Sequence, residues 1–172
     1  MNFRVLFPVS LCACLLGVFA ACRPPPPAAA LPVLGPAPAW RLPDAGGRMV
    51  SSADFAGQVV LVNFWATWCE PCRQEIPGFL ALEKKYSARG LVVLGFSLDR
   101  AGPDAVRKFA AEQGMDYPLL LADDHAVGAF GMANGRPIPT TFLIDREGRI
   151  RHVQTGVAPA EEYARLVASL FP

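Results

Sequence analysis

From residue 40 onward, short apolar runs alternate with more polar stretches. The segments 59–65 and 91–97 are almost continuously apolar, which is typical of strands buried on both faces of a sheet. A helix is expected after each of them, over 69–88 and over 103–113, with a glycine just beyond each helix end. Strands that alternate with helices in this way are expected to lie parallel, joined by the helices.

The remaining elements are shorter. Two hairpins are expected, over 39–50 and over 140–154, with a turn or short helix over 51–55. One more strand is expected over 118–121 and a loop or brief helix over 123–132. An amphipathic terminal helix is expected over 159–171. The late hairpin adds antiparallel strands to the parallel ones. The pattern therefore predicts an α/β domain with a mixed central sheet flanked by helices.

The N-terminal stretch has a different pattern. A positive start at Arg4 is followed by seventeen uncharged residues, 5–21, which is typical of a secretory signal and short for a membrane span of about 20 residues. The segment 18–22 ends in Cys22 and resembles the lipobox of bacterial lipoproteins, whose cysteine is acylated and becomes the mature N-terminus. A cleaved signal without a lipid and an uncleaved anchor are the alternatives.

Seven prolines follow within residues 23–39, and they favour extended polyproline II, which needs no core. At about 3.1 Å per residue, such a tether could hold the domain up to about 50 Å from a membrane. The predicted organisation is a signal peptide over 1–21, a lipidated cysteine with a proline-rich tether over 22–39, and a folded domain over 40–172. We expect an exported lipoprotein anchored on the periplasmic side of a membrane.

Composition excludes some classes of function. The 172 residues suffice for one domain, and 16 basic against 15 acidic residues give a net charge of +1, which offers no footprint for nucleic acid. Three of the five cysteines precede residue 23, which argues against a disulfide scaffold. Nothing in the sequence demands an oligomer, and a monomer is expected.

The candidate chemistry lies in Cys69-Glu70-Pro71-Cys72, directly after a buried strand and at the start of a predicted helix. Sulfurs three positions apart on a helix point to one side and can form a disulfide. Cys69 is closest to the free N–H groups and positive dipole of the helix start, which favours its thiolate, so we expect it to be the nucleophile. Cys72, one turn further in, is expected to resolve the mixed disulfide. Pro71 suits the first turn, and Glu70 complements the dipole.

Two other interpretations of the pair fit the sequence less well. A structural zinc site needs four ligands, and His125 and His152 are distant from the pair and from each other. A purely structural disulfide across two residues would restrict the unfolded chain very little. A redox-active dithiol that needs no other cofactor is therefore predicted.

The segment 62–72 resembles the active-site strand and helix of the thioredoxin superfamily, and more narrowly that of the exported TlpA/ResA-type thiol-disulfide oxidoreductases. Glu75, Pro77 and the segment 138–145 match further features of that group. The resemblance covers about 38–172 and implies a thioredoxin-like fold, with an N-terminal β-hairpin extension and a mid-domain insertion.

The resemblance also implies roles for further residues. Pro139 is expected to be a cis-proline that sets Ile138 beside the dithiol, where a substrate chain pairs with its backbone. Trp68 is expected to cover the disulfide, and Glu70 and Pro71 complete the substrate-binding set. Asn63 stands where cytosolic thioredoxins carry a buried, proton-shuttling aspartate. Asparagine cannot titrate, so Glu75 is the candidate proton acceptor for Cys72; a solvated glutamate is the alternative.

We expect a membrane-tethered protein-disulfide reductase. The resemblance suggests protein thiols as partners, including those of apocytochrome c or a copper-site protein, and a membrane electron donor that restores the dithiol. An exported thiol oxidant or isomerase is the first alternative, and a copper-binding module that uses the cysteine pair is the second. A peroxiredoxin fits less well, because Ala66 stands where that family has threonine.

Overall fold

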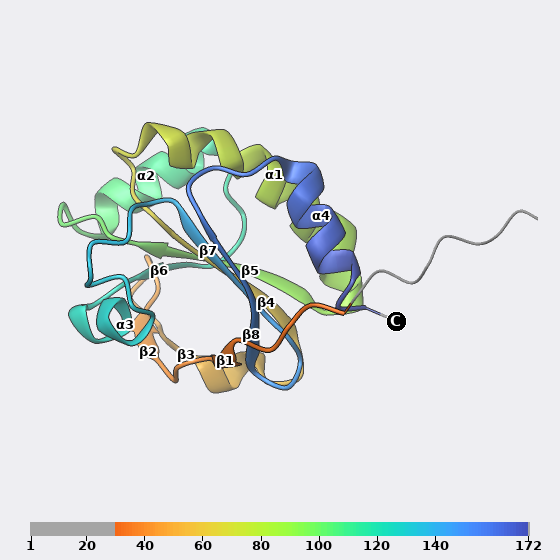
Figure 1. Cartoon of the computed structure of the whole chain (residues 1–172). Coiled ribbons are helices and arrows are strands. Elements are labelled where there is room, and N and C mark those ends of the chain that lie inside the picture. The colour runs from red at the N-terminus through yellow and green to blue at the C-terminus, as the bar shows by residue number, and fades with distance from the viewer. Residues whose placement is uncertain (1–29, 172) are drawn as a thin grey trace, which may run out of the picture.

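The computed structural model describes residues 30–171 of the chain (Figure 1). The expected signal peptide, Cys22 and the first part of the expected tether lie outside the described residues. Within 30–171, no helix combines the length and the apolar character that a membrane crossing requires.

A six-stranded sheet forms the centre of the domain, in the order β1-β8-β7-β4-β5-β6. Its strands in chain order are β1 (Gly35–Pro36), β4 (Val59–Trp65), β5 (Leu91–Ser97), β6 (Leu119–Leu121), β7 (Thr140–Ile144) and β8 (Arg149–Thr155). β5 pairs parallel with β4 and β6, whereas β7 pairs antiparallel with β4 and β8. The mixed sheet expected from the sequence is confirmed.

Helices cover both faces of this sheet (Figure 1). They are α1 (Glu70–Tyr86), α2 (Pro103–Gln113), α3 (Asp124–Ala129) and α4 (Ala160–Ala168), with 3-10 turns at Ser52–Phe55 and Ser87–Arg89. α1, α2 and α4 pack on one face. On the other face, α3 lies with the hairpin of β2 (Arg41–Pro43) and β3 (Met49–Ser51). The expected hairpin is thus present, and α3 lies within the expected insertion.

β4 is the strand that both packing layers share, and all seven of its side chains are buried. Leu61 and Trp65 belong to the core beneath α1, α2 and α4, while Val62 and Phe64 belong to the core beneath α3. Successive side chains of a strand point to opposite faces, so a strand covered on both sides must be apolar at nearly every position. This requirement explains the continuous apolar run.

The structure corrects the expected tether, which was predicted to run through residue 39. Leu34 donates its backbone N–H to the Ile150 carbonyl, and Ala37 donates to the Gly148 carbonyl, both at 2.8 Å, so β1 extends the sheet beside β8. Pro36 is tolerated there because proline can occupy an edge strand. The pairing of β1 also covers the edge of β8, which would be exposed if residues 35 and 36 were extended in solvent.

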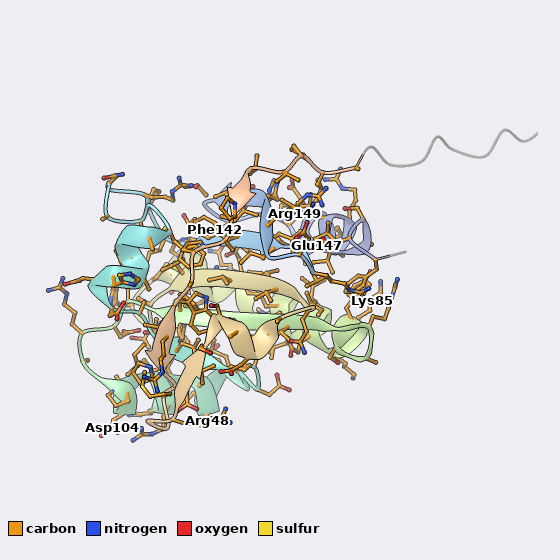
Figure 2. All side chains as sticks on the ribbon, turned by 90° about the horizontal axis from the view of Figure 1, so that it is seen from below. Arg48, Lys85, Asp104, Phe142, Glu147 and Arg149 are labelled. Carbon is orange, nitrogen blue, oxygen red and sulfur yellow. A yellow bond between two sulfur atoms is a disulfide. The ribbon has the colours of Figure 1, made fainter. Side chains whose placement is uncertain are left out.

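The turn between β7 and β8 is built around Asp145, which is 4% exposed. This carboxylate accepts hydrogen bonds from the Arg149 backbone and side chain and from Arg151, each at 2.9 Å. Arg151 also donates to the Leu31 carbonyl, which ties the N-terminal segment to the turn. Figure 2 shows Arg149 and Glu147 together at this turn, where they form an ion pair. Burial alone would raise the pKa of Asp145, but these donors outweigh it and lower the pKa to about 2.

Asp145→Asn is expected to lower the free energy of unfolding at pH 7 by about 2 kcal/mol, because the two arginines lose their shared charge. The folded-state pKa lies below the ordinary value, so this stability is present above about pH 4 and is lost as the pH falls through about 2. Urea unfolding at pH 7 and at pH 2 measures the difference. Glu112→Gln, on the exposed side of α2, is the control. An equal loss in Asp145→Asn at both pH values would contradict the assignment.

Candidate active site

Cys69 and Cys72 form a disulfide at the start of α1, with their Cα atoms 5.3 Å apart. Cys69 is the N-cap residue, directly before α1 begins at Glu70, and Cys72 lies in the first turn of the helix. Both are buried, at 4% and 2% exposure. β4 ends at Trp65, so the four residues from Ala66 to Cys69 carry the chain from the centre of the sheet directly to the helix start.

The helix start favours a thiolate on Cys69. The backbone N–H of Cys72 points at the Cys69 Sγ atom at 3.2 Å, and the positive end of the helix dipole acts on the same atom. Glu70 would oppose a thiolate, but its carboxylate is exposed and pairs with Arg73 at 3.4 Å. Pro71 occupies the first helical turn, where its missing N–H leaves no helix bond unmade.

The loop before Cys69 is fixed by Asp99, a residue that the sequence analysis missed. The Asp99 carboxylate accepts the Thr67 backbone N–H at 3.0 Å, the Thr67 hydroxyl at 2.5 Å and the Ser97 hydroxyl at 2.7 Å. These bonds hold the loop on which Trp68 projects into solvent with 68% of its surface exposed. Asp99 follows β5 in a stretch with no recognisable motif, so only the pairing of β4 with β5 reveals it.

The Ile138–Pro139 peptide bond is cis in the structure, as the resemblance implies. Thr140, the next residue, pairs with Phe64, one position before the end of β4. Pro139 therefore lies at the same end of the central strands as the loop that leads to Cys69. Ile138 is half-buried and contacts both hydrophobic cores, which fixes the position of its backbone at this end of the sheet.

Glu75 lies one turn beyond Cys72 on the same side of α1 and is only 4% exposed, so the solvated alternative is wrong. Its Oε1 atom accepts the Ala158 backbone N–H at 3.1 Å and the Tyr163 hydroxyl at 2.8 Å. Within residues 30–171, its Oε2 atom has no hydrogen-bond partner. Burial raises the pKa of Glu75 above its ordinary value, and the two hydrogen bonds oppose this rise.

Tyr163 was also missed as part of the site. The sequence indicates only an amphipathic terminal helix around it, and 88 residues separate it from Glu75. No group of three or more His, Cys, Asp and Glu side chains that could hold a metal ion occurs within residues 30–171. The groups that the structure brings together at the site are a disulfide, a buried acid and a cis-proline segment.

Comparison with known proteins identifies this arrangement. At the level of sequence, ResA, a thiol-disulfide oxidoreductase of Geobacillus thermodenitrificans, is 34% identical over 137 residues, which cover 79% of this chain and 76% of that protein. Among solved structures, a thiol:disulfide interchange protein of the thioredoxin family from Chlorobium tepidum aligns with a TM-score of 0.72 and 33% identity, over 79% of this chain and 95% of that one. A secreted thiol-disulfide isomerase from Corynebacterium glutamicum aligns with a TM-score of 0.70 and 26% identity, over 77% and 82% of the two chains.

The fold is thioredoxin-like, and the protein is a thiol-disulfide oxidoreductase that acts by dithiol-disulfide exchange. A model of the AhpC/TSA family matches residues 33–153, and the chain belongs to that family. The match begins within the expected tether and agrees with the position of β1 in the folded domain.

Reduced Cys72→Ser protein is expected to accumulate a mixed disulfide with a disulfide-containing peptide, because Cys69 attacks but nothing resolves the adduct. Reduced Cys69→Ser protein, the matched control, should accumulate far less, because it lacks the cysteine at the helix N-cap. Mass spectrometry under non-reducing conditions detects the added peptide. Equal trapping by both variants would contradict the assignment of Cys69 as nucleophile.

Proposed function

We propose that the protein is an exported, membrane-tethered reductase of protein disulfides. Its substrates are paired cysteines of exported metal-binding proteins, apocytochrome c and copper-site proteins being the examples. The leader over 1–21, Cys22 and the proline-rich stretch support export and anchoring. The secreted relative from Corynebacterium glutamicum is consistent with export. The redox pair is the only cofactor that this mechanism needs.

The observation that carries the proposal is the surface around the disulfide. Trp68 exposes a large apolar ring directly beside Cys69, and the cis bond before Pro139 brings the Ile138 backbone to the same end of the sheet. No hydrogen bond of the Ile138 backbone is formed within residues 30–171. An extended substrate segment can therefore pair with this backbone while its disulfide meets Cys69.

In the proposed reaction, the Cys69 thiolate attacks one sulfur of the substrate disulfide. The substrate S–S bond breaks, one substrate thiolate leaves, and a mixed disulfide with Cys69 forms. Cys72 then gives its proton to the Glu75 carboxylate and attacks the Cys69 sulfur. The intramolecular disulfide forms as the second substrate thiolate leaves, so the substrate gains two electrons and the dithiol loses two. A membrane-bound dithiol donor restores Cys69 and Cys72.

The equilibrium reduction potential of the Cys69/Cys72 couple tests the direction of exchange. A reductase that works against an oxidising compartment is expected to have a potential near that of thioredoxin, about −270 mV. Equilibration with glutathione or dithiothreitol buffers, followed by alkylation and mass spectrometry, measures it. A value near about −120 mV would instead indicate an oxidant. The absence of a reversible couple, with tight stoichiometric uptake of copper, would favour the copper-binding alternative.

Lipidation at Cys22 is tested in a bacterial host that processes lipoproteins. Cys22→Ala is expected to lose incorporation of labelled fatty acid, because the acylated sulfur is absent. Cys14→Ala changes the other leader cysteine nearest to it and should keep both the label and the membrane fraction. Retention of the lipid label by Cys22→Ala would refute lipidation at Cys22, and an unlabelled wild-type protein would indicate one of the alternatives, an ordinary cleaved signal or an uncleaved anchor.

A further inference from the structure

Four buried polar side chains from four different elements form a chain through the core beneath α1 and α4. They are Asn63 on β4, Thr141 on β7, Tyr163 on α4 and Glu75 on α1, and none is more than 5% exposed. Asn63 Nδ2 donates to Thr141 Oγ1 at 2.9 Å, and the Tyr163 hydroxyl donates to Glu75 Oε1 at 2.8 Å. The Thr141 side chain is also near enough to Tyr163 to act on the pKa of its hydroxyl. Buried polar groups in such number need partners, and here they partner one another.

The two hydrogen bonds, Asn63 to Thr141 and Tyr163 to Glu75, run in one direction. An amide Nδ2 group can only donate, so the Thr141 hydroxyl accepts from Asn63 and its own hydrogen is free to point at Tyr163. Tyr163 directs its own hydrogen at the Glu75 carboxylate. The Tyr163 hydrogen bond therefore favours the ionised form of Glu75, which is the form able to accept a proton. Chains of this kind strengthen their members, since each bond polarises the next.

We propose that Tyr163, oriented by Thr141 and Asn63, is a positioning residue that sets the proton affinity of Glu75 and thereby the pH range in which Cys72 is deprotonated. The inference rests on the proposed role of Glu75 as proton acceptor and assigns the residues that regulate it. Tyr163 does not touch the sulfurs; it acts through the carboxylate alone.

The balance of forces at Glu75 agrees with this role. Burial disfavours its charge, and the Tyr163 hydrogen bond is one of two that oppose the resulting rise in the pKa of Glu75. Burial raises the pKa of Tyr163 far above its ordinary value, so its hydroxyl keeps its hydrogen throughout the working range. Tyr163 can therefore serve as a permanent donor.

Other titratable groups lie near the same region. Cys72 lies one turn away on α1, and Tyr117 comes from the segment before β6, close enough to Glu75 for the Glu75 charge to raise the pKa of Tyr117. The charge of Glu162 on α4 raises the pKa of Tyr163. His152 on β8 lies opposite Leu143 on the same face of the sheet. Of these groups, only Tyr163 donates a hydrogen bond to Glu75.

The experiment uses the full mature protein and a single-cysteine peptide joined to itself by a disulfide. Reduced protein releases one peptide thiol when Cys69 attacks and the second when Cys72 resolves the adduct, so the slower appearance of the second thiol isolates the step that involves Glu75. Its rate should rise with pH through the ionisation of Glu75. Glu75→Gln should abolish this acid limb, because an amide cannot take the proton.

Tyr163→Phe should shift the acid limb upward by about one pH unit, which is the loss of one charge-assisted hydrogen bond. The ring that packs on Phe79 is retained. Thr141→Val should shift the limb in the same direction by less, and it tests the chain should Tyr163→Phe fail to fold. Tyr117→Phe, which removes a buried hydroxyl that is not bonded to Glu75, should leave the limb in place.

The outcomes distinguish a failure of the proposed role of Glu75 from a failure of the proposed role of Tyr163. If Glu75→Gln keeps the acid limb, Glu75 is not the acceptor, and that step of the proposed function fails. If Glu75→Gln removes the limb while Tyr163→Phe and Thr141→Val leave it unmoved, the inference about Tyr163 is overturned and the proposed role of Glu75 stands. In a Glu75→Gln background, Tyr163→Phe should change the profile no further, which distinguishes positioning from a general loss of packing.

Discussion

The burial of β4 on both faces is the constraint on which the site depends. The two cores hold this strand in the middle of the sheet, so its carboxyl end has one fixed position and direction. The short loop after Trp65 transfers that position to Cys69, and Asp99 stiffens the loop through Thr67. The cis-proline segment is aligned with the same strand through the pairing of Thr140 with Phe64. Cys69, the proposed nucleophile, and the Ile138 backbone, the proposed docking segment, thus share one support.

The local sequence pattern was enough to predict most of the helices and strands, because each of them is marked by residues within its own segment. A run of apolar residues over 59–65 demands double burial, and glycines close the predicted helices at Gly90 and Gly114. The dithiol followed from its place at a helix start and from its spacing, since three residues along a helix bring two sulfurs together. The edge strand at residue 35 was missed because composition favoured extended chain there, and only the unpaired edge of β8 supplies a reason for it to dock.

The supporting residues of the site could not be found in the same way. Asp99 and Tyr163 have ordinary local contexts, and their importance comes from partners 32 and 88 residues away. Glu75 was a candidate from the sequence, but the sequence of a helix does not distinguish a buried glutamate from an exposed one. Its burial is decided by α4, which packs across α1 from the far end of the chain. Long-range contacts thus determine the electrostatics of a site whose reactive atoms are locally encoded.

The docking of β1 has a geometric consequence for an anchored protein. Chain bound to the sheet from residue 31 onward cannot serve as spacer, and the eight steps from Cys22 to Ala30 span no more than about 30 Å at full extension. The described chain begins at the end of the domain where the C-terminus lies, opposite the start of α1 (Figure 1). A lipid at Cys22 would therefore hold that end near the bilayer and turn the disulfide outward, toward partners that approach from the aqueous side.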